Sequence, residues 1–413
     1  MNRKKLHQTK RGGFALGLVM CVLILMLVIG AGMLNLGMHG SNMATRTSSE
    51  IAARSAADAG LTQGLHSMNQ MLEAKTWNDS SLPSVIDAPL LNSDATFSYT
   101  VTKTTAADSN DDFYTIESSG KYGLARKKVY STLEMKGIFE YAIFVADNMM
   151  LRNGTTVSAY NKKAGDPPLQ IGTNSTASGA IIAKTGVTID GDVVVGVGGD
   201  ADVVINNTTE AAISGQTYPS LIKNKIPNIN VPKALVDMAS SGSITAAGTI
   251  STSAKYDSIN LAADPNKGAT LTIDGNVKLY VTGDIQLGNS DVLQIVDQTT
   301  NPDASLVIYL GGNLITDNSG AINNLTQDPK KLKIFGLDTC TNVDFKNSGS
   351  FYGAIYAPNA DVHFYNSVTV YGAVVSKSFT QDVNANFFYD MSLREAEPSE
   401  IGVHMVVKRW SEE

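Results

Sequence analysis

The chain has 413 residues, with 32 Lys and Arg against 39 Asp and Glu, which gives a formal net charge of −7. This balance excludes the broad basic surface of a nucleic-acid-binding protein, and the length allows two or three ordinary domains or one long repetitive one. Two distant cysteines, Cys21 and Cys340, predict neither an internal disulfide nor a zinc site. Five scattered histidines are expected to be neither ligands nor bases: His7, His39, His66, His363 and His404.

Residues 1–13 form a basic leader with five Lys and Arg and no acidic residue. The apolar run Phe14–Leu34 follows at once, and its length suffices for a helix that spans a bilayer, which takes about 20 residues. Basic residues ahead of such a span keep the amino terminus in the cytoplasm. We therefore predict a single-pass membrane protein whose remaining chain is exported.

The helix is predicted to continue past the apolar run, over residues 14–76. Apolar residues recur at helical spacing from Ile51 to Leu72, and the first proline is Pro83. Such a helix is on the order of 90 Å long, and Gly30 and Gly32 permit close approach to another helix. A cleaved secretory signal, which has a shorter apolar region and a small-residue cleavage site, and a simple signal anchor are the alternatives.

Two stretches, "RGGFAL" (Arg11–Leu16) and "AARSAADAGL" (Ala52–Leu61), together resemble the amino-terminal region of PilX-type minor pilins and related pseudopilins of type IV filament systems. The resemblance implies that a prepilin peptidase cuts between Gly13 and Phe14. It also implies that the helix then leaves the inner membrane and packs against other pilins in a filament. Asp58 stands where this family more usually has Glu.

Leu18 departs from the pattern of the major pilins. Those proteins carry Glu as the fifth mature residue, where it can neutralise the terminal ammonium of a neighbour; an unpaired ammonium in an apolar bundle is costly. Minor pilins of the PilX type and the tip-capping pseudopilin commonly lack this Glu. Leu18 therefore argues against a repeating shaft subunit and leaves a minor, priming or tip role open.

Residues 77–136 are predicted to form an antiparallel β meander on the helix. Pro83–Pro89 is interpreted as a loop, and alternating polar and apolar residues then indicate three strands. These are Ala95–Thr104, Asp111–Gly120 and Ala125–Lys136. An acidic turn of Asp108, Asp111 and Asp112 is interpreted as a solvated hairpin loop in preference to a calcium site.

Residues 137–390 alternate short apolar strands with Gly, Asn and Asp turns, which predicts a β-solenoid. The pattern "TIDG-[DN]-V" occurs at Thr188–Val193 and Thr272–Val277, and similar stretches begin at Tyr352 and Tyr371, 19 residues apart. A proline-containing segment between Asn206 and Val236 is interpreted as an excursion across the solenoid. Residues 391–413 form a tail with a closing strand.

The predicted fold class is thus α+β, with a long amino-terminal transmembrane helix, a small antiparallel sheet and a large, irregular, mainly-β right-handed β-helix. The style of the solenoid also resembles the β-solenoid ends of PilX-like proteins, most specifically over Phe351–Asp390.

Five aspartates are the candidates for glycan chemistry, because β-helices also host carbohydrate-acting enzymes: Asp190, Asp192, Asp274, Asp284 and Asp361. Asp190 and Asp192 are two residues apart, so both could act as a pair on one strand face. A "DGD" turn at a solenoid corner gives the same spacing, and we favour that interpretation. The glycine–aspartate stretch Gly196–Val204 is too short and imperfect for a calcium repeat.

The sequence predicts a structural subunit with no catalytic residue, cofactor or metal. Its expected partners are other pilins, the pilus assembly platform, the prepilin peptidase and the inner membrane. The solenoid would lie in the periplasm or outside the cell, in the filament or free of it, where surface glycans are further candidate partners. The alternative is a membrane-anchored β-helix that binds or cleaves carbohydrate.

Overall fold

A computed structural model describes residues 14–105, 112–207, 211–264, 268–347 and 349–412. The chain divides into two compact units, which we describe separately. The first consists of residues up to Met71, Trp77–Glu134 and Met405–Glu413, and the second of Leu72–Thr76 and Met135–His404. The carboxyl-terminal strand therefore belongs to the first unit, although almost the whole second unit precedes it in the sequence.

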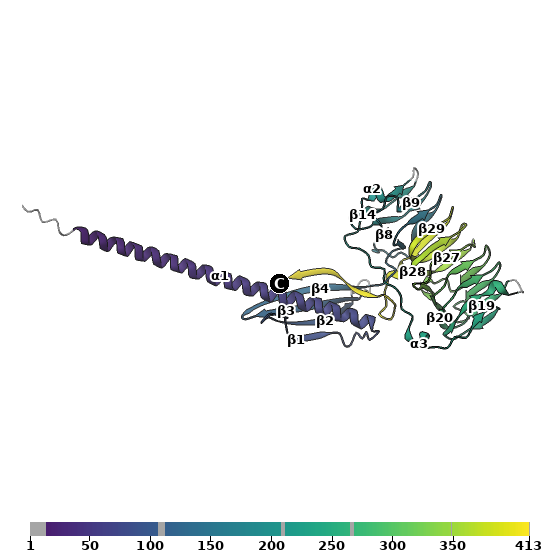
Figure 1. Ribbon diagram of the computed structural model, residues 1–413, viewed down its shortest axis with the longest axis horizontal. Coiled ribbons are helices and arrows are strands. Elements are labelled where there is room, and N and C mark those ends of the chain that lie inside the picture. Colours follow the sequence, from purple (N-terminus) through teal and green to yellow (C-terminus); the bar gives the residue numbers. More distant parts are fainter. Residues whose placement is uncertain (1–13, 106–111, 208–210, 265–267, 348, 413) are drawn as a thin grey trace, which may run out of the picture. The chain divides into compact units, whose positions relative to one another are not determined.

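Helix α1 (Phe14–Glu73) is the first element of the first unit and runs without a break for 60 residues (Figure 1). Its amino-terminal half is apolar, and its second half is rich in alanine. The helix ends three residues before the predicted boundary. Lys75 takes a left-handed conformation with φ 56°, which stops the helical hydrogen-bond pattern there.

Within the described residues, five strands form the sheet beside α1, in the spatial order β1–β2–β3–β4–β31. Their bounds are β1 Ser84–Pro89, β2 Thr96–Thr105, β3 Asp112–Tyr122, β4 Ala125–Lys136 and β31 His404–Glu412. The pairs β1–β2, β2–β3 and β3–β4 are antiparallel, which confirms the expected direction of the three predicted strands.

The loop predicted at Pro83–Pro89 is wrong, because Ser84–Pro89 forms the edge strand β1. A bulge between Val85 and Ala88, with Asp87 at φ 50°, interrupts its pairing with β2. Proline is tolerated on an edge strand, whose outward N–H groups need no partner. The two prolines that suggested a loop therefore mark the ends of an edge strand.

The second unit is built mainly from short parallel strands. Its strands before the middle of the unit are β5 Ile143–Val145, β6 Met149–Leu151, β7 Thr156–Tyr160, β8 Leu169–Thr173, β9 Ile181–Ala183, β10 Thr188–Ile189, β11 Gly191–Val195, β12 Ile205–Asn207, β13 Ala212–Ile213 and β14 Thr217–Pro219. Next come β15 Ser243–Ile244, β16 Gly248–Ile250, β17 Ala254–Tyr256, β18 Ser258–Asn260, β19 Thr270–Ile273, β20 Asn276–Val281, β21 Ile285–Leu287 and β22 Val292–Ile295.

The remaining strands of this unit are longer towards the end. They are β23 Ser305–Leu310, β24 Leu314–Thr316, β25 Ala321–Asn324, β26 Leu332–Gly336, β27 Asn342–Phe345, β28 Ser350–Phe364, β29 Thr369–Gln381 and β30 Asn386–Asp390. Over the described part of this unit, five one-turn helices lie between or after the strands: α2 Ala201–Val204, α3 Lys233–Val236, η1 Leu261–Ala263, η2 Pro329–Lys331 and η3 Met391–Arg394.

These strands pair in parallel ladders, and one ladder runs β14–β11–β8–β5–β29–β28–β26–β23–β20–β17. Tyr352 pairs with Tyr371, which confirms that the two similar stretches are neighbours in the stack. The order of the ladder is not the order of the sequence. Residues 143–219 stack onto the late strand β29, whereas residues 243–364 stack away from it on the other side.

Only the later part of the predicted excursion, between β14 and β15, joins opposite ends of the ladders. The expectation that Asn206–Val236 lacks strands is wrong for its first part, because β13 and β14 stack on β10 and β11. Side-chain hydrogen bonds hold the later part to the strands. Asn174 Nδ2 donates to the carbonyl of Asn224 at 2.8 Å, and the Tyr356 hydroxyl donates to the carbonyl of Pro227 at 2.7 Å. We call residues 220–232 the connecting strap.

The core of the second unit lies between the ladders and consists of Val, Ile, Leu and Phe side chains. Phe345 and Phe364, from neighbouring strands, stack with ring centroids 4.8 Å apart. A second aromatic row stands on the outer side. Tyr352 and Tyr371 stack at 4.4 Å, and Tyr371 and Phe388 at 5.0 Å, so that most ring faces are covered by one another.

Candidate functional site: the helix and its sheet

The amino-terminal half of α1 has no partner among the described residues. Every described side chain from Leu16 to Ser48 is exposed. This part carries no Asp, Glu, Lys or Arg before Arg46, and the helix is long and apolar enough to cross a membrane. An apolar helix surface of this extent is unfavourable in water, which is consistent with a membrane anchor.

The predicted assembly residues lie on or near this part. Gly13 lies outside the described residues, and Phe14 is the first residue of α1. Leu18 is 58% exposed, and no atom stands within 4 Å of a Cβ placed at Gly30 or Gly32. Asp58 is half-buried in the second half of the helix, and its carboxylate lies 4.0 Å from Arg54 Nε.

Small residues bring the second half of α1 close to the sheet. Ala53, Ala56 and Ala57 are fully buried. A Cβ at Gly120 of β3 would overlap the carbonyl oxygen of Ala53, and one at Gly60 would overlap Ser118. The Ser118 hydroxyl donates to the Ala57 carbonyl at 2.7 Å. Main chain therefore packs directly on main chain, which fixes the helix on the sheet.

Strand β31 adds charged contacts to the same helix. Arg54 Nη2 lies 3.1 Å from a carboxylate oxygen of Glu412, and its guanidinium stands 5.7 Å from the ring centroid of Trp410. Asn69 accepts a hydrogen bond from the Met405 N–H at 2.7 Å. The closing strand predicted in the tail, residues 391–413, is β31, and it completes the sheet beside α1.

A polar cluster holds the chain where it leaves the helix. Asp79 accepts hydrogen bonds from Lys103 Nζ at 2.7 Å, Trp77 Nε1 at 2.8 Å and the Tyr114 hydroxyl at 3.0 Å. Partial burial disfavours the charged carboxylate, but these hydrogen bonds and the Lys103 charge outweigh it and hold the pKa of Asp79 below its usual value. No feature of the sequence singled out this cluster.

The candidate aspartates of the second unit are engaged by neighbouring strands and turns. Asp190 accepts from the Ser214 hydroxyl at 2.9 Å, and the buried Asp192 accepts from the Gln216 N–H at 2.8 Å. Asp284, Asp274 and Asp361 likewise accept from Asn313 N–H, Asn301 Nδ2 and the Ser378 hydroxyl. Each carboxylate thus joins one strand or turn to another. Asp190, Asp274 and Asp284 lie in turns, as favoured from the sequence, whereas Asp192 lies inside β11 and Asp361 inside β28.

The predicted calcium candidates gain no support in the described residues. Asp108 and Asp111 lie outside them, and in Gly196–Val204 the side chain of Asp200 caps helix α2 through the Asp202 N–H at 3.0 Å. The described part of the chain contains no group of three or more His, Cys, Asp or Glu side chains arranged to hold a metal ion.

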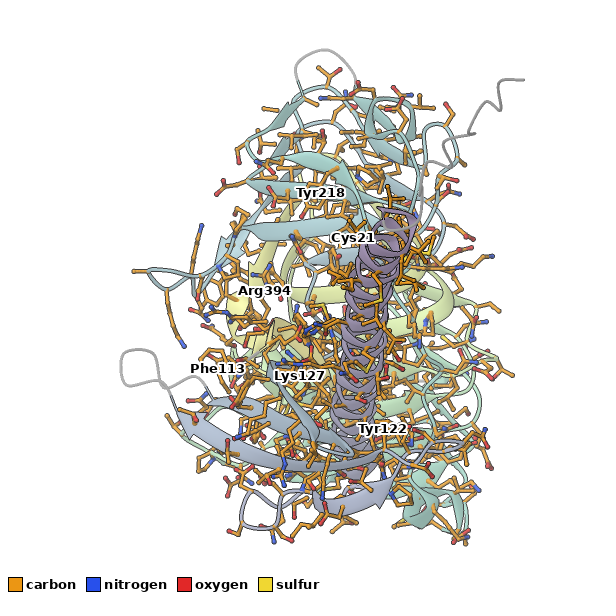
Figure 2. The ribbon with its side chains drawn as sticks, turned by 90° about the vertical axis from the view of Figure 1, so that its left-hand side faces the viewer. Cys21, Phe113, Tyr122, Lys127, Tyr218 and Arg394 are labelled. Carbon is orange, nitrogen blue, oxygen red and sulfur yellow. The ribbon has the colours of Figure 1, made fainter. Side chains whose placement is uncertain are left out.

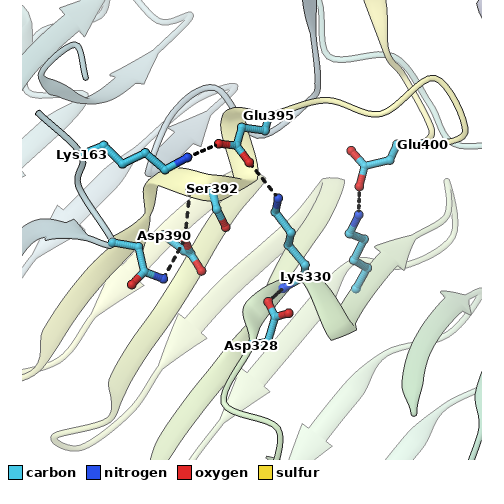
Figure 3. Close-up of polar contacts among 9 residues, drawn as sticks. Lys163, Asp328, Lys330, Asp390, Ser392, Glu395 and Glu400 are labelled. Atoms are coloured by element: carbon cyan, nitrogen blue, oxygen red, sulfur yellow. Dashed lines mark hydrogen bonds and ion pairs between the residues drawn. The ribbon is translucent and has the colours of Figure 1, made fainter. Parts of the chain in front are cut away.

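The tail of the second unit is held by ion pairs (Figure 3). Glu395 lies between Lys163 at 2.7 Å and Lys330 at 3.3 Å. The hydrogen bond from Lys163 outweighs partial burial and, with Lys330, lowers the pKa of Glu395. Glu400 pairs with Lys333 in the same region. These charges fasten the tail to the strands, and both carboxylates, Glu395 and Glu400, are paired.

Comparison with known proteins gives one family match. The family described as a domain of unknown function (DUF7305) matches residues 225–396, which is less than half of the chain. The matched range begins in the connecting strap and covers the strands that stack in sequence order. A search of curated proteins finds no match.

Three solved structures show distant likeness, each at 12% sequence identity. The competence-associated pilin ComZ from Thermus thermophilus has a TM-score of 0.31 over 88% of this chain and 97% of its own. An ice-binding protein from the Antarctic ascomycete Antarctomyces psychrotrophicus has 0.24 over 60% and 94%. One from an Antarctic bacterium of the Flavobacteriaceae has 0.24 over 60% and 80%.

Proposed function

We propose that the chain is a pilin-like structural subunit, a minor pilin or pseudopilin of a type IV filament system. One observation carries the proposal: a helix exposed on all sides over residues 16–48 continues unbroken to Glu73, where its second half packs on an antiparallel sheet. A rigid rod of this kind can be held by lipid and later by other apolar helices without refolding.

The exported part of this subunit is a right-handed β-helix in our proposal. The parallel ladders and the apolar interior between them support this assignment. Such a stack displays a large, rigid surface while its function in the filament resides in α1. The subunit needs no catalytic residue or cofactor for this role, and its partners are other pilins, the assembly platform and the prepilin peptidase.

The alternative, a carbohydrate-binding or carbohydrate-acting β-helix, lacks a favouring observation on the described residues. The carboxylates that suggested it make contacts between strands and turns. The outer aromatic row turns most of its ring faces toward its own members. We therefore do not propose it.

The maturation step is tested by the mass of the membrane-extracted protein. We expect cleavage between Gly13 and Phe14 in a host with an active prepilin peptidase, and an intact amino terminus in a host without it. Leu18 replaces the Glu of shaft subunits, so the mature protein should be a minor component of the filament. Intact Met1 in the competent host would refute maturation by this route.

Helix association is tested with the native Cys21, which is exposed on α1 while Cys340 is buried. A second pilin is given a single cysteine in its own apolar helix, at the level of Cys21. If the two helices pack together, mild oxidation of membranes or of sheared filaments should link the two proteins by a disulfide through Cys21. The Cys21→Ser variant is the matched control. Linkage that stays absent over a full scan of partner positions would remove the assembly role.

A further inference from the structure

The two hairpin turns at one end of the first unit's sheet carry features that the proposed function does not use. Pro89 pairs with Thr96, Thr96 with Lys121, and Lys121 with Arg126. These registers place the β1–β2 turn, residues 90–95, and the β3–β4 turn at the same end. We call Lys121–Arg126 the hairpin tip.

The hairpin tip lies toward the apolar half of α1. Along β3, Gly120 packs against Ala53 and Ala57, whereas Tyr114, near the other end, contacts Trp77 beyond the helix. Four further residues of strand cover roughly 13 Å, which equals about nine residues of helix. The tip therefore reaches roughly the height of Arg46, the first charged residue after the apolar run. Figure 2, a view nearly along the helix, labels Tyr122 of the hairpin tip and Lys127, which directly follows it.

The turns expose apolar side chains where polar ones are usual. Leu124, at the centre of the hairpin tip, is completely exposed, with a relative accessibility of 102%, and Leu91 in the β1–β2 turn is 86% exposed. Gly123 takes a left-handed conformation, φ 57°, that turns the chain directly before Leu124. The hairpin thus presents an aliphatic side chain at its outermost point.

Two cations flank that leucine, and no carboxylate of the described residues forms an ion pair with either of them. Lys121 and Arg126 are exposed and stand directly opposite each other on neighbouring strands. Like charges in this position repel each other, so an external anion would relieve the repulsion. Of the acidic groups near this end, Glu50 pairs with Arg46 at 3.0 Å, and Asp94 is exposed in the other turn. Glu412 pairs with Arg54 at 3.1 Å and lies 4.0 Å from Lys127.

We propose that the hairpin tip binds the anionic phospholipid surface of the membrane that holds α1. The apolar run ends at Leu34, and about 12 residues, or about 18 Å of helix, separate it from Arg46. In this proposal α1 therefore tilts toward the side of the sheet, which brings the hairpin tip to the headgroup layer. There Leu124 inserts among the headgroups, and Lys121 and Arg126 contact lipid phosphates. An apolar side chain between cations suits this interface. The proposal rests on one part of the proposed function, the passage of α1 through the bilayer, and is independent of the peptidase and of filament assembly.

The test uses the full chain reconstituted in vesicles of phosphatidylcholine with phosphatidylglycerol, with a fluorophore at position 124 and a nitroxide-labelled lipid as quencher. The labelled variant is Leu124→Cys in a Cys21→Ser background, in which Cys340 is buried. Thr104→Cys, exposed near the opposite end of the sheet, is the matched control. The native Cys21, labelled in the wild-type chain, reports separately on the helix.

We expect lipid to quench the label at position 124 about threefold more than the label at 104. The difference should shrink severalfold in phosphatidylcholine alone, and equally with Lys121→Gln and Arg126→Gln combined. Equal quenching at 124 and 104, with Cys21 quenched, overturns this proposal and leaves the membrane helix standing. An unquenched Cys21 overturns both. If the quenching at position 124 is the same with and without phosphatidylglycerol, the proposed role of the two cations is wrong.

Discussion

Asp79 joins three side chains at the point where α1 gives way to the sheet. Its hydrogen bonds come from an ammonium, an indole and a phenol, so both the charge and the geometry of the carboxylate are used. The carboxylate is 43% exposed, and solvent screening limits what each contact contributes. Its effect on stability should accordingly be modest and depend on pH.

Replacing Asp79 with Asn should lower the unfolding free energy of the first unit by less than about 1 kcal/mol at neutral pH. The folded pKa lies below the unfolded value of about 3.9, so the contribution is present above that value and is lost as pH falls through the folded pKa. Urea unfolding followed by tryptophan fluorescence at neutral and acidic pH measures it. Asp94→Asn is the control, and an equal loss there would remove the assignment.

Gly120 is where the helix and the sheet approach most closely. Gly120→Ala should lower the unfolding free energy by about 3 kcal/mol or more. The added carbon would overlap the main chain of Ala53, which, unlike a side chain, cannot move to another rotamer. Ser119→Ala, on the next residue and the opposite face of β3, should cost less than about 0.5 kcal/mol. Thermal unfolding in detergent compares the two. Similar midpoints would mean that the helix does not sit tightly on the sheet.

Cys340 and Cys21 should differ sharply in reactivity. Burial raises the pKa of the Cys340 thiol to about 11, so at pH 8 only about one thiol in a thousand is ionised. A small, membrane-permeant thiol reagent should react in the folded protein with Cys21, which only detergent covers, and not with Cys340, and it should react with both cysteines after denaturation. The Cys21→Ser variant should show no reaction before denaturation; a rapid reaction in it would contradict the buried position of Cys340.

At the scale of elements, the connecting strap depends on a few side chains of the strands. The Tyr356 hydroxyl donates to Pro227, and the Tyr356 ring is fully buried. The strap contributes Ile229 to the core and packs Ile226 and Val231 against it, whereas its first half, with Leu221 at 95%, is largely exposed. Its order should therefore respond to the loss of a single hydrogen bond.

Tyr356→Phe removes that hydrogen bond and keeps the ring. Losing about 1 kcal/mol should open the strap about fivefold more often. Trypsin, which cuts at Lys223 and Lys225, should cleave the strap faster by a similar factor. Tyr352→Phe changes a hydroxyl of the outer aromatic row and is the control. Equal cleavage of both variants and the wild type would show that the hydroxyl does not hold the strap.

Some elements of the fold can be predicted from the sequence and others cannot. The helix follows from one uninterrupted apolar run without proline, and the Tyr352–Tyr371 pairing follows from a repeated stretch. Strand β1 was missed because an edge strand tolerates the prolines that suggested a loop. The sequence predicts a strand at β31. Its pairing with β4 joins residues more than 200 positions apart, and the local sequence pattern cannot predict such a pairing.

The same limit applies to the site. Apolar composition predicts which part of α1 needs a partner. That Leu124, Lys121 and Arg126 lie at the same end of the sheet as the β1–β2 turn follows only from the strand register, which the sequence does not reveal. The five candidate aspartates illustrate the opposite case. Their residue type suggested a catalytic role, but their hydrogen bonds show that they connect strands and turns.

At the scale of the whole molecule, the stacking order sets the course of folding. Strand β5, which begins at Ile143, pairs with β29 around Val374, although more than 200 residues separate them. Residues 143–219 therefore cannot complete their stack until β29 is in place. Pairings this distant in sequence form slowly, since the loop must close before the contacts stabilise it.

Hydrogen exchange during refolding of the denatured chain in detergent should reveal this order. The amides of β28 and β29, whose stretches lie 19 residues apart in the sequence, should gain protection first. Those of β5, β6 and β8 should follow in a slower phase, because β5 and β6 need β29 as their template. Val374→Pro, which blocks the edge that β5 uses, should abolish the slow phase and leave the pairs among β20, β23 and β26 protected. If residues 143–183 were protected before β29, this segment would fold without β29, and β29 would add to strands that are already paired.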